Sequence, residues 1–238
     1  MARFIVISGI DGCGKTTLIQ GLRTRLEQEG LTTRYEWLRY NHRLVRPVHG
    51  LSRLVGLSRR YKVAWASRPG IQDHGQDARA TTGSQFVWRH EFYRSRLFCS
   101  FYILLTWLDA WLGRLILAAR LSSKDVDIVV CDRWVQDILV DLAVDTRQRD
   151  LLAGTWHSRF TRILPPGARQ YLIVRDSDRV VSSRPDVLQD MSHSFRKKLY
   201  RRLEKSPDVV VVRNNGTIEA AVDAIFGDWK SWACRYSS

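Results

Sequence analysis

Residues 9–16 read Gly-Ile-Asp-Gly-Cys-Gly-Lys-Thr and match the pattern G-x-x-x-x-G-K-[ST] at every fixed position. A short apolar run at residues 4–7 precedes this stretch, and a helical pattern follows it over residues 15–29. Strand, glycine-rich loop and helix, in this order, are the context in which the pattern binds phosphate. A plain glycine-rich turn is the alternative, although such a turn requires neither Lys15 nor the flanking elements.

The loop residues have expected roles toward a nucleotide. Glycines allow successive backbone N–H groups to turn toward phosphate oxygens, and Lys15 brings a positive charge to the transferred phosphates. Thr16 is expected to place its hydroxyl on Mg²⁺. The expected ATP-binding residues are Gly9, Asp11, Gly12, Cys13, Gly14, Lys15, Thr16 and Thr17. Because kinases, ATPases, GTPases and sulfotransferases share this loop, it leaves the reaction open.

Residues 34–38, which alternate charged and aromatic side chains, look like a second strand, and the segments 127–131, 170–174 and 208–212 predict three more, with helical patterns between most of them. Continuous apolar strands suit a parallel sheet that is covered on both faces. We therefore expect an α/β fold of three layers, a P-loop NTPase fold with a five-stranded parallel sheet flanked by helices. A chain of 238 residues suits one domain, so residues 1–238 are expected to form a single unit.

Residues 40–96 are basic, polar and rich in scattered glycines, and we expect an insertion of short helices and loops there. The whole chain carries 38 Lys and Arg against 24 Asp and Glu, a formal charge of +14 that attracts polyanions. Aromatic residues lie among the basic ones, which is one argument for nucleic-acid binding. A helical subdomain with a solvated face is the favoured interpretation, because these residues form no spaced motif.

A long apolar segment at residues 97–121 predicts a helix that is buried on nearly every side, against the sheet or a partner subunit. Asp109 and Arg114 interrupt it, so a membrane span is not expected. Trp107, Trp111 and Leu115 follow helical spacing and suit a homodimer interface through residues 97–120. Packing within one subunit explains the same stripe.

The four cysteines show no paired spacing, so neither a disulfide framework nor a zinc site is expected, and a reducing, cytoplasmic location fits best. The first ten residues are interpreted as a strand and not as a signal peptide, because glycines and Lys15 follow where a cleavage region would lie.

Asp132 and Arg133 directly follow the strand at residues 127–131, at the edge where open α/β sheets bind ligands. Asp132 is expected near Mg²⁺, and Arg133 is expected to bridge the donor and acceptor phosphates. The alternative is an Asp-Arg pair that caps the next helix.

Residues 4–17, with the loop in the form G-x-D-G-x-G-K-T-T, and residues 129–134 resemble the thymidylate kinase family of nucleoside monophosphate kinases. The resemblance extends over about residues 3–38 and 97–232. It implies ATP- and Mg²⁺-dependent phosphoryl transfer to a small nucleotide, dTMP + ATP to dTDP + ADP or a related acceptor. It also implies that Asp11 approaches the acceptor's sugar or phosphate and that Arg133 orients the phosphates.

The same resemblance implies a lid at residues 177–195 that carries a catalytic arginine. Arg184 is the better candidate because it lies beside Pro185, and Arg179 is the other. The expected catalytic set is thus Lys15, Asp132, Arg133 and Arg184. Residues 213–216 occupy the place where similar kinases hold the adenine, although Asn-Asn-Gly is also an ordinary turn.

The acceptor pocket departs from the family pattern. Asp109 has no neighbouring arginine of the kind that addresses the base, and Arg39 follows the second strand where R-E-P-G-G-T is usual. The expected acceptor residues are Asp11, Arg39, Asp109 and Arg133, with Arg39 equally consistent with a surface arginine. A nucleoside or another metabolite is therefore the alternative acceptor. A P-loop regulatory or nucleic-acid-binding protein is the alternative from a different class.

Overall fold

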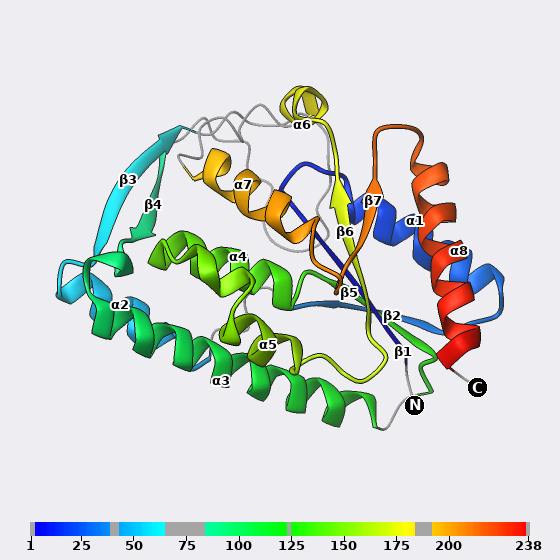
Figure 1. Cartoon of the computed structure of the whole chain (residues 1–238), viewed down its shortest axis with the longest axis horizontal. Helices are drawn as coiled ribbons and strands as arrows, with labels where there is room; N and C mark the ends of the chain where they lie inside the picture. The colour runs from blue at the N-terminus through cyan, green and yellow to red at the C-terminus, as the bar shows by residue number, and fades with distance from the viewer. Residues whose placement is uncertain (1–2, 39–42, 65–83, 123–124, 184–191, 237–238) are drawn as a thin grey trace.

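A computed structural model describes residues 3–38, 43–64, 84–122, 125–183 and 192–236. Figure 1 shows a central sheet with helices on both sides. Its five parallel strands lie in the spatial order β2-β5-β1-β6-β7. They are β1 (Arg3–Gly9), β2 (Thr33–Trp37), β5 (Ile128–Asp132), β6 (Arg169–Val174) and β7 (Val210–Arg213). The predicted α/β fold with a five-stranded parallel sheet is confirmed.

Alternate residues along the inner strands β1, β5 and β6 face two separate hydrophobic cores, as the period of a β-strand requires. Ile5 and Ile7 belong to the core formed with α1 (Lys15–Gln28) and α8 (Ile218–Tyr236). Val6 and Leu172 belong to the other core. The helices on that side are α3 (Arg96–Leu121), α4 (Val135–Thr146), α5 (Thr155–Thr161) and α7 (His193–Leu203). Because both of their faces are covered, the inner strands contain continuous apolar runs, whereas the edge strand β2 carries Arg34 and Glu36.

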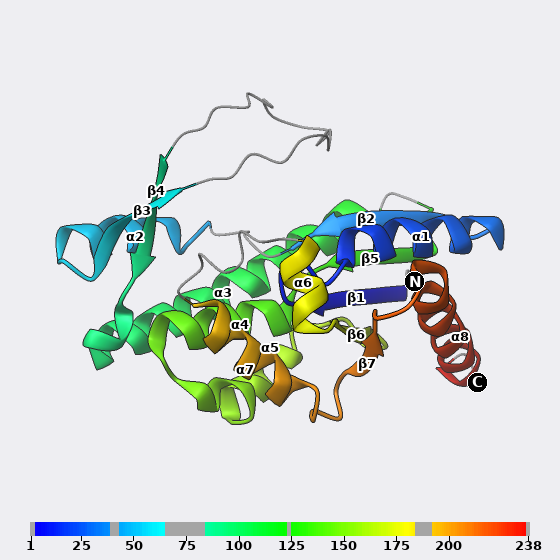
Figure 2. The same cartoon turned by 90° about the horizontal axis from the view of Figure 1, so that it is seen from above.

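The basic insertion differs from the prediction. It contains the expected short helix, α2 (Arg46–Leu54), but β3 (Ser58–Ala64) and β4 (Ser84–His90) pair as a separate antiparallel sheet. The expectation of helices and loops alone is therefore wrong for these strands. In the sequence, Tyr61 and Val63 alternate with cations, which is a strand pattern that the basic composition conceals. Figure 2 shows this hairpin standing apart from the central sheet; residues 65–83 lie outside the described residues.

The long helix α3 is confirmed, but it is buried on one side only. The buried side includes Tyr102, Ile103 and Asp109, whereas a stripe on the opposite side is exposed. The exposed apolar residues of α3 are Leu97, Phe101, Leu104, Leu108 and Leu115. By length and composition α3 could cross a membrane, and it is the one such helix among the residues that the structure describes. Its buried side packs into the core of the fold.

Two tryptophans of the expected dimer stripe pack within their own chain. Trp107 Nε1 donates to the carbonyl oxygen of Arg159 at 3.2 Å, and the guanidinium of Arg114 lies over the Trp111 ring at 4.9 Å. Of the three residues named from the sequence, only Leu115 is widely exposed, at 60%. The exposed apolar stripe of α3 therefore differs from the predicted stripe of Trp107, Trp111 and Leu115, because only Leu115 belongs to both.

Shorter elements lie between these in the described part of the chain. They are two 3-10 helices, η1 (Phe92–Arg94) and η2 (Arg149–Leu152), and the helix α6 (Ser177–Ser183), which follows β6. The carboxyl ends of β1, β5 and β6 are neighbours in the sheet. The loops that follow them therefore converge, and the candidate site is formed there.

Candidate functional site

The backbone of the loop after β1 requires glycine at two positions. Gly9 has φ +150°, and a Cβ atom there would lie 2.5 Å from the carbonyl oxygen of Ile173. Gly14 has φ +92°, and a Cβ there would lie 2.5 Å from Nδ2 of Asn214. The helix α1 begins at the next residue, and Gly14, its N-cap, provides no side-chain cap. The N–H groups of this first turn therefore face the loop without a side chain that caps them.

Lys15 turns its ammonium group into the loop. Its Nζ donates to the carbonyl oxygens of Gly9 at 2.7 Å and Ile10 at 2.9 Å, and it lies 3.7 Å from Sγ of Cys13. Burial raises the pKa of the Cys13 thiol, so this group is neutral at neutral pH. Thr16 and Thr17 are exposed at the start of α1. The arrangement places one buried cation beside two exposed hydroxyls.

Asp132 lies at the end of β5, and its two carboxylate oxygens have different surroundings. Its Oδ2 accepts a hydrogen bond from the hydroxyl of Tyr35 at 3.1 Å. Its Oδ1 is buried and has no hydrogen-bond partner among the described residues. Burial raises the pKa of Asp132, while the charges of Lys15 and Arg133 lower it.

A buried carboxylate oxygen without a partner calls for an explanation, and a bound cation is one of the ordinary explanations. Mg²⁺ prefers oxygen ligands and usually binds through one or two carboxylates together with nucleotide phosphates. Asp132 and the hydroxyl of Thr16 are oxygen donors of this kind. The residues present therefore fit a magnesium ion.

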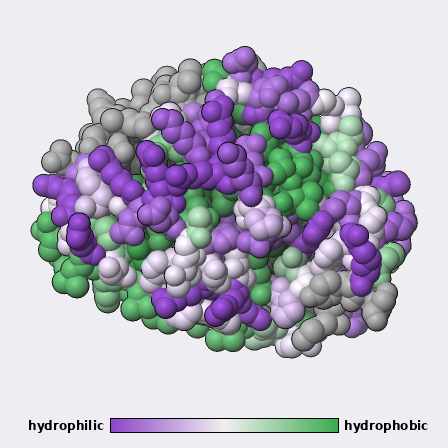
Figure 3. Space-filling view, in the orientation of Figure 1, coloured by the Kyte–Doolittle hydropathy of each residue, from purple (hydrophilic) through white to green (hydrophobic). Residues whose placement is uncertain are grey.

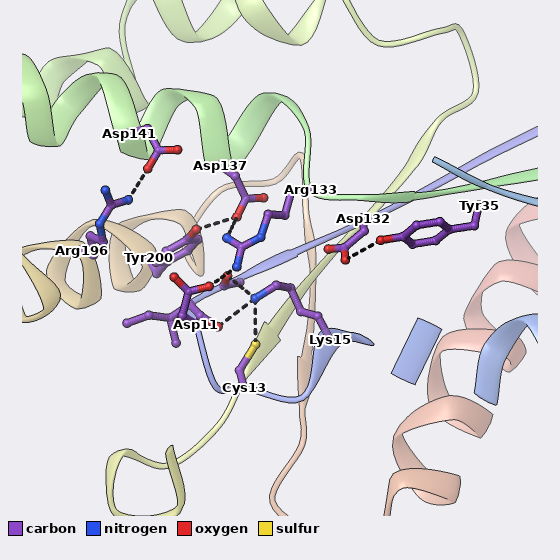
Figure 4. Close-up of polar contacts among 12 residues, drawn as sticks. Asp11, Cys13, Lys15, Tyr35, Asp132, Arg133, Asp137, Asp141, Arg196 and Tyr200 are labelled. Carbon is purple, nitrogen blue, oxygen red and sulfur yellow. Dashed lines mark hydrogen bonds and ion pairs between the residues drawn. The ribbon is translucent and has the colours of Figure 1, made fainter. Parts of the chain in front are cut away.

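Arg133 has an unusual backbone and two anionic partners. Its φ of 62° is left-handed, which is rare outside glycine and is often found at functional sites. Its Nη1 donates to Oδ1 of Asp137 at 3.0 Å, and its Nη2 forms an ion pair with Asp11 of the loop. The hydroxyl of Tyr200, on α7, donates to the same Oδ1 of Asp137 at 2.7 Å. Figure 4 shows these side chains converging beside Lys15.

The interpretation of Asp132 and Arg133 as a helix cap is wrong. The N-cap residue of α4 is Trp134, and no side chain of the described residues caps this helix at that position. The side chains of Asp132 and Arg133 instead point toward the phosphate-loop residues, as Figure 4 shows.

The segment after β7 packs directly on the glycine-rich loop. Nδ2 of the buried Asn214 donates to the carbonyl oxygen of Cys13 at 2.8 Å, and Oδ1 of Asn215 accepts from the backbone N–H of Asp176 at 3.0 Å. Arg179 donates to the carbonyl oxygen of Asn215. The turn at residues 213–216 is thus linked to the loop and to the start of α6.

The remaining expected residues lie elsewhere or outside the described part of the chain. Asp109 is buried in α3, where its Oδ1 accepts from the backbone N–H groups of Arg43 at 3.0 Å and Leu44 at 3.2 Å. It therefore anchors the segment that precedes α2. Arg39 and Arg184 lie outside the described residues. The structure brings together Asp11, Cys13, Lys15, Asp132 and Arg133.

Three polar residues of this cluster were not expected from the sequence. Asp137 lies one helical turn after Arg133, so the i, i+4 spacing of an arginine and a carboxylate was a usable signal. Tyr35 belongs to β2, the predicted neighbour strand, and its contact depends on the sheet order. Tyr200 is 63 residues from Asp137, and no local pattern indicates that contact.

No family model matches this chain, and no curated protein matches its sequence. Among solved structures, 185 chains match it. One is the thymidylate kinase from Candida albicans, whose structure was described as revealing the origin of broad substrate specificity and a novel structural element. The TM-score is 0.52 at 13% sequence identity, over 97% of this chain and 92% of that one. A likeness at this identity shows the fold, which agrees with the P-loop NTPase class predicted from the sequence.

Proposed function

We propose that this protein is a nucleoside monophosphate kinase, which transfers the γ-phosphoryl group of ATP to an acceptor of the dTMP class. The observation that carries the proposal is the pair of buried cations at one loop. Lys15 lies inside the phosphate loop, and Arg133 lies beside it between two carboxylates. Phosphoryl transfer depends mainly on positioning and on charge stabilisation, and two fixed cations supply both. The fold likeness to a thymidylate kinase supports this choice among P-loop activities.

On the donor side, the loop and the start of α1 hold the ATP phosphates. The N–H groups of residues 12–16 donate to phosphate oxygens, which replace the loop carbonyls as partners of Lys15. Thr16 and Asp132 hold Mg²⁺, which when bound neutralises charge on the β- and γ-phosphates. Cys13 is a buried, neutral part of the loop wall. The amide of Asn214 fixes the loop carbonyl of Cys13, and residues 213–216 bound the adenine end of the site.

On the acceptor side, Arg133 faces both phosphates. Asp11 shares its guanidinium and is half exposed, with 42% of its side chain accessible, so an incoming phosphate competes for the same nitrogen. The acceptor therefore binds next to Asp11 and Arg133. Arg39 and Arg184 are proposed as further phosphate contacts, and Asp109 is proposed to act on the acceptor pocket through the segment that it anchors.

The acceptor pocket differs from the thymidylate kinase pattern. The arginine that addresses the base in thymidylate kinases is missing beside Asp109. The similar Candida albicans enzyme is described as having broad substrate specificity. A nucleoside or another phosphorylatable metabolite is therefore the alternative acceptor, with the donor side unchanged.

The test is ADP formation from Mg-ATP by the purified full chain, with a panel of nucleoside monophosphates and nucleosides as acceptors. We expect turnover that requires an acceptor and that is lost in Lys15→Ala, while Lys15→Ala remains folded by circular dichroism. If a nucleoside is the preferred acceptor, the protein is still a kinase, but its substrate is a nucleoside and not a nucleoside monophosphate. Tight ATP binding without turnover on any acceptor would contradict the proposed activity.

A second candidate function rests on α7. Lys198, Arg201 and Arg202 are exposed at the spacing of one face of α7, and the exposed Lys205 follows just after the helix ends, in a chain of formal charge +14. Figure 3 shows hydrophilic surface across the region that α7 occupies in Figure 1. Such a face suits an anionic polymer such as a nucleic acid. Binding that weakens steeply with salt, and that is lost when these four residues are replaced by glutamine, would support this function.

We also propose that two copies associate through α3. Leu97, Phe101, Leu104 and Leu108 recur every three or four residues, and Leu115 follows seven residues later on the same side, as in helix pairs that bury an apolar seam. Figure 3 shows apolar surface along the lower edge, where α3 lies in Figure 1. The cytoplasmic location expected from the cysteines remains a prediction.

A further inference from the structure

The guanidinium of Arg133 is held by one inner and one outer carboxylate. The inner one, Asp137, is only 1% exposed, whereas Asp11 is accessible from the loop side. A phosphate group that enters the site can compete with the exposed outer carboxylate, whereas the inner one is shielded by the surrounding fold. The inner contact therefore decides where the guanidinium points during the reaction.

The inner carboxylate is itself oriented by α7. The hydroxyl of Tyr200 donates to Oδ1 of Asp137 at 2.7 Å, and this oxygen also accepts from Nη1 of Arg133 at 3.0 Å. Oδ2 of Asp137 has no partner among the described residues. Burial raises the pKa of Tyr200 well above its ordinary value, so the hydroxyl keeps its proton and remains a donor. Among the described residues, the two hydrogen bonds at Oδ1 orient this carboxylate.

A second contact connects the same two helices. Arg196 of α7 forms an ion pair with Asp141 of α4, one turn along each helix from Tyr200 and Asp137. Figure 4 shows the two pairs side by side. The register of α7 on α4 is thus fixed at two points, and the position of the Tyr200 hydroxyl follows from it.

We propose that Asp137 and Tyr200 are positioning residues for Arg133, through which the placement of α7 sets the direction of the guanidinium toward the phosphates. This inference rests on the proposed kinase function, because it assigns the positioned group to phosphoryl transfer. Under this proposal the site depends on α7 through the hydroxyl of Tyr200.

The test is Tyr200→Phe in the full chain, which removes one hydroxyl and keeps the ring. Steady-state kinetics with the best acceptor should show a drop in kcat of roughly tenfold to a hundredfold, the size expected when a catalytic group is slightly misplaced. The affinity for ATP should stay the same. The matched control is Tyr102→Phe, since Tyr102 is also buried and donates to a carboxylate, Asp145, at 3.1 Å.

A double variant separates positioning from general stability. In an Arg133→Ala background, Tyr200→Phe should cause no further loss of kcat, because the group that it positions is absent. A further loss in that background, or a kcat of Tyr200→Phe that matches the Tyr102→Phe control, would overturn the proposal.

NMR of the Arg133 guanidinium tests its positioning without any need for turnover. In protein with isotope-labelled arginine, the Arg133 guanidinium should give a resolved NMR signal of restricted rotation, assigned by its loss in Arg133→Lys. In Tyr200→Phe the guanidinium should rotate more freely, which averages this signal. In Tyr102→Phe the signal should stay resolved. An unchanged Arg133 signal in Tyr200→Phe would contradict the positioning role. Absence of turnover in the unmodified protein would instead contradict the proposed function.

Discussion

Gly14 connects the sequence pattern with the loop geometry most directly. Its backbone is left-handed, and its missing side chain leaves room for the Asn214 amide, which holds the carbonyl oxygen of Cys13. Two separate requirements therefore select glycine at this position. Gly30 has a similar φ of +79°, but no atom lies within 4 Å of a Cβ built there.

We predict that Gly14→Ala lowers the free energy of unfolding by ~2 kcal/mol through backbone strain and a close contact, and that it abolishes measurable ATP binding. Gly30→Ala should show the strain alone, with ~1 kcal/mol of destabilisation and normal ATP binding. Urea unfolding and calorimetric titration with ATP measure both quantities. Equal ATP affinities of the two variants would show that the contact with Asn214 does not shape the loop.

The charge of Asp132 should matter for ATP binding only when Mg²⁺ is present. Asp132→Asn keeps the shape of the side chain and the hydrogen-bond contact with Tyr35, but it removes the charge. Affinity for ATP in the presence of Mg²⁺ should fall by about tenfold or more, because one anionic metal ligand is lost. Affinity for ATP with excess chelator should be unchanged or slightly higher, since a negative charge near the phosphates is gone. A similar loss of affinity with and without Mg²⁺ would contradict the assignment of Asp132 to the metal.

The helix α8 is attached to the sheet by a polar contact near its middle, at Asp228. Asp228 accepts two hydrogen bonds from Arg169 of β6, each at 2.9 Å, and a third from the hydroxyl of Tyr171 at 2.7 Å. The hydrogen bonds from Arg169 hold the pKa of Asp228 below its ordinary value. This carboxylate therefore stabilises the fold in its charged form.

The sign of the pH effect follows from that lowered pKa. The contribution of Asp228 is fully present above its unfolded pKa of about 3.9 and is lost as pH falls through the lower folded value. At neutral pH, Asp228→Asn should lower the free energy of unfolding by ~2 kcal/mol. The difference from the unmodified protein should shrink only below about pH 4.

Denaturant unfolding between pH 7 and pH 3 measures this difference. The exposed Asp223 lies on the same helix, so Asp223→Asn is the matched control and should have little effect at any pH. A difference for Asp228→Asn that already disappears between pH 7 and pH 5 would contradict the lowered pKa.

The elements of the central fold could be predicted because each depends on a local pattern. The strand at β5 is a continuous apolar run, and the loop after β1 has glycines at fixed spacing. The pair β3 and β4 could not be predicted in the same way, because alternating cations make the strand pattern resemble a solvated loop. Tyr200 and Asp137 could not be paired, since the contact depends on how α7 crosses α4.

The exposed side of α3 concerns the whole molecule. The exposed apolar residues of this helix form a contiguous stripe, whereas single exposed leucines are ordinary on a protein surface. The stripe therefore indicates a contact surface. Because each chain carries a formal charge of +14, two copies also repel each other. Association through α3 must therefore gain enough from apolar burial to exceed this repulsion, and salt should favour it by screening.

We predict a dimer by light scattering during size-exclusion chromatography, and a higher dimer fraction at higher salt. Leu104→Glu combined with Leu108→Glu should give a monomer, because two carboxylates would be buried in the seam. The matched control is Ile218→Glu, an exposed apolar residue on α8, which should leave the dimer intact. A monomer for the unmodified protein under all salt conditions would contradict this interface.

The central claim is that a phosphoryl group passes from ATP to an acceptor, and phosphorus NMR tests it most directly. In a mixture of Mg-ATP, dTMP and the full chain, we predict signals of a second diphosphate that grow together with those of ADP, and no such growth with Lys15→Ala. Equal formation of ADP and free phosphate, with dTMP and every other acceptor unchanged, would show hydrolysis instead and would contradict the account.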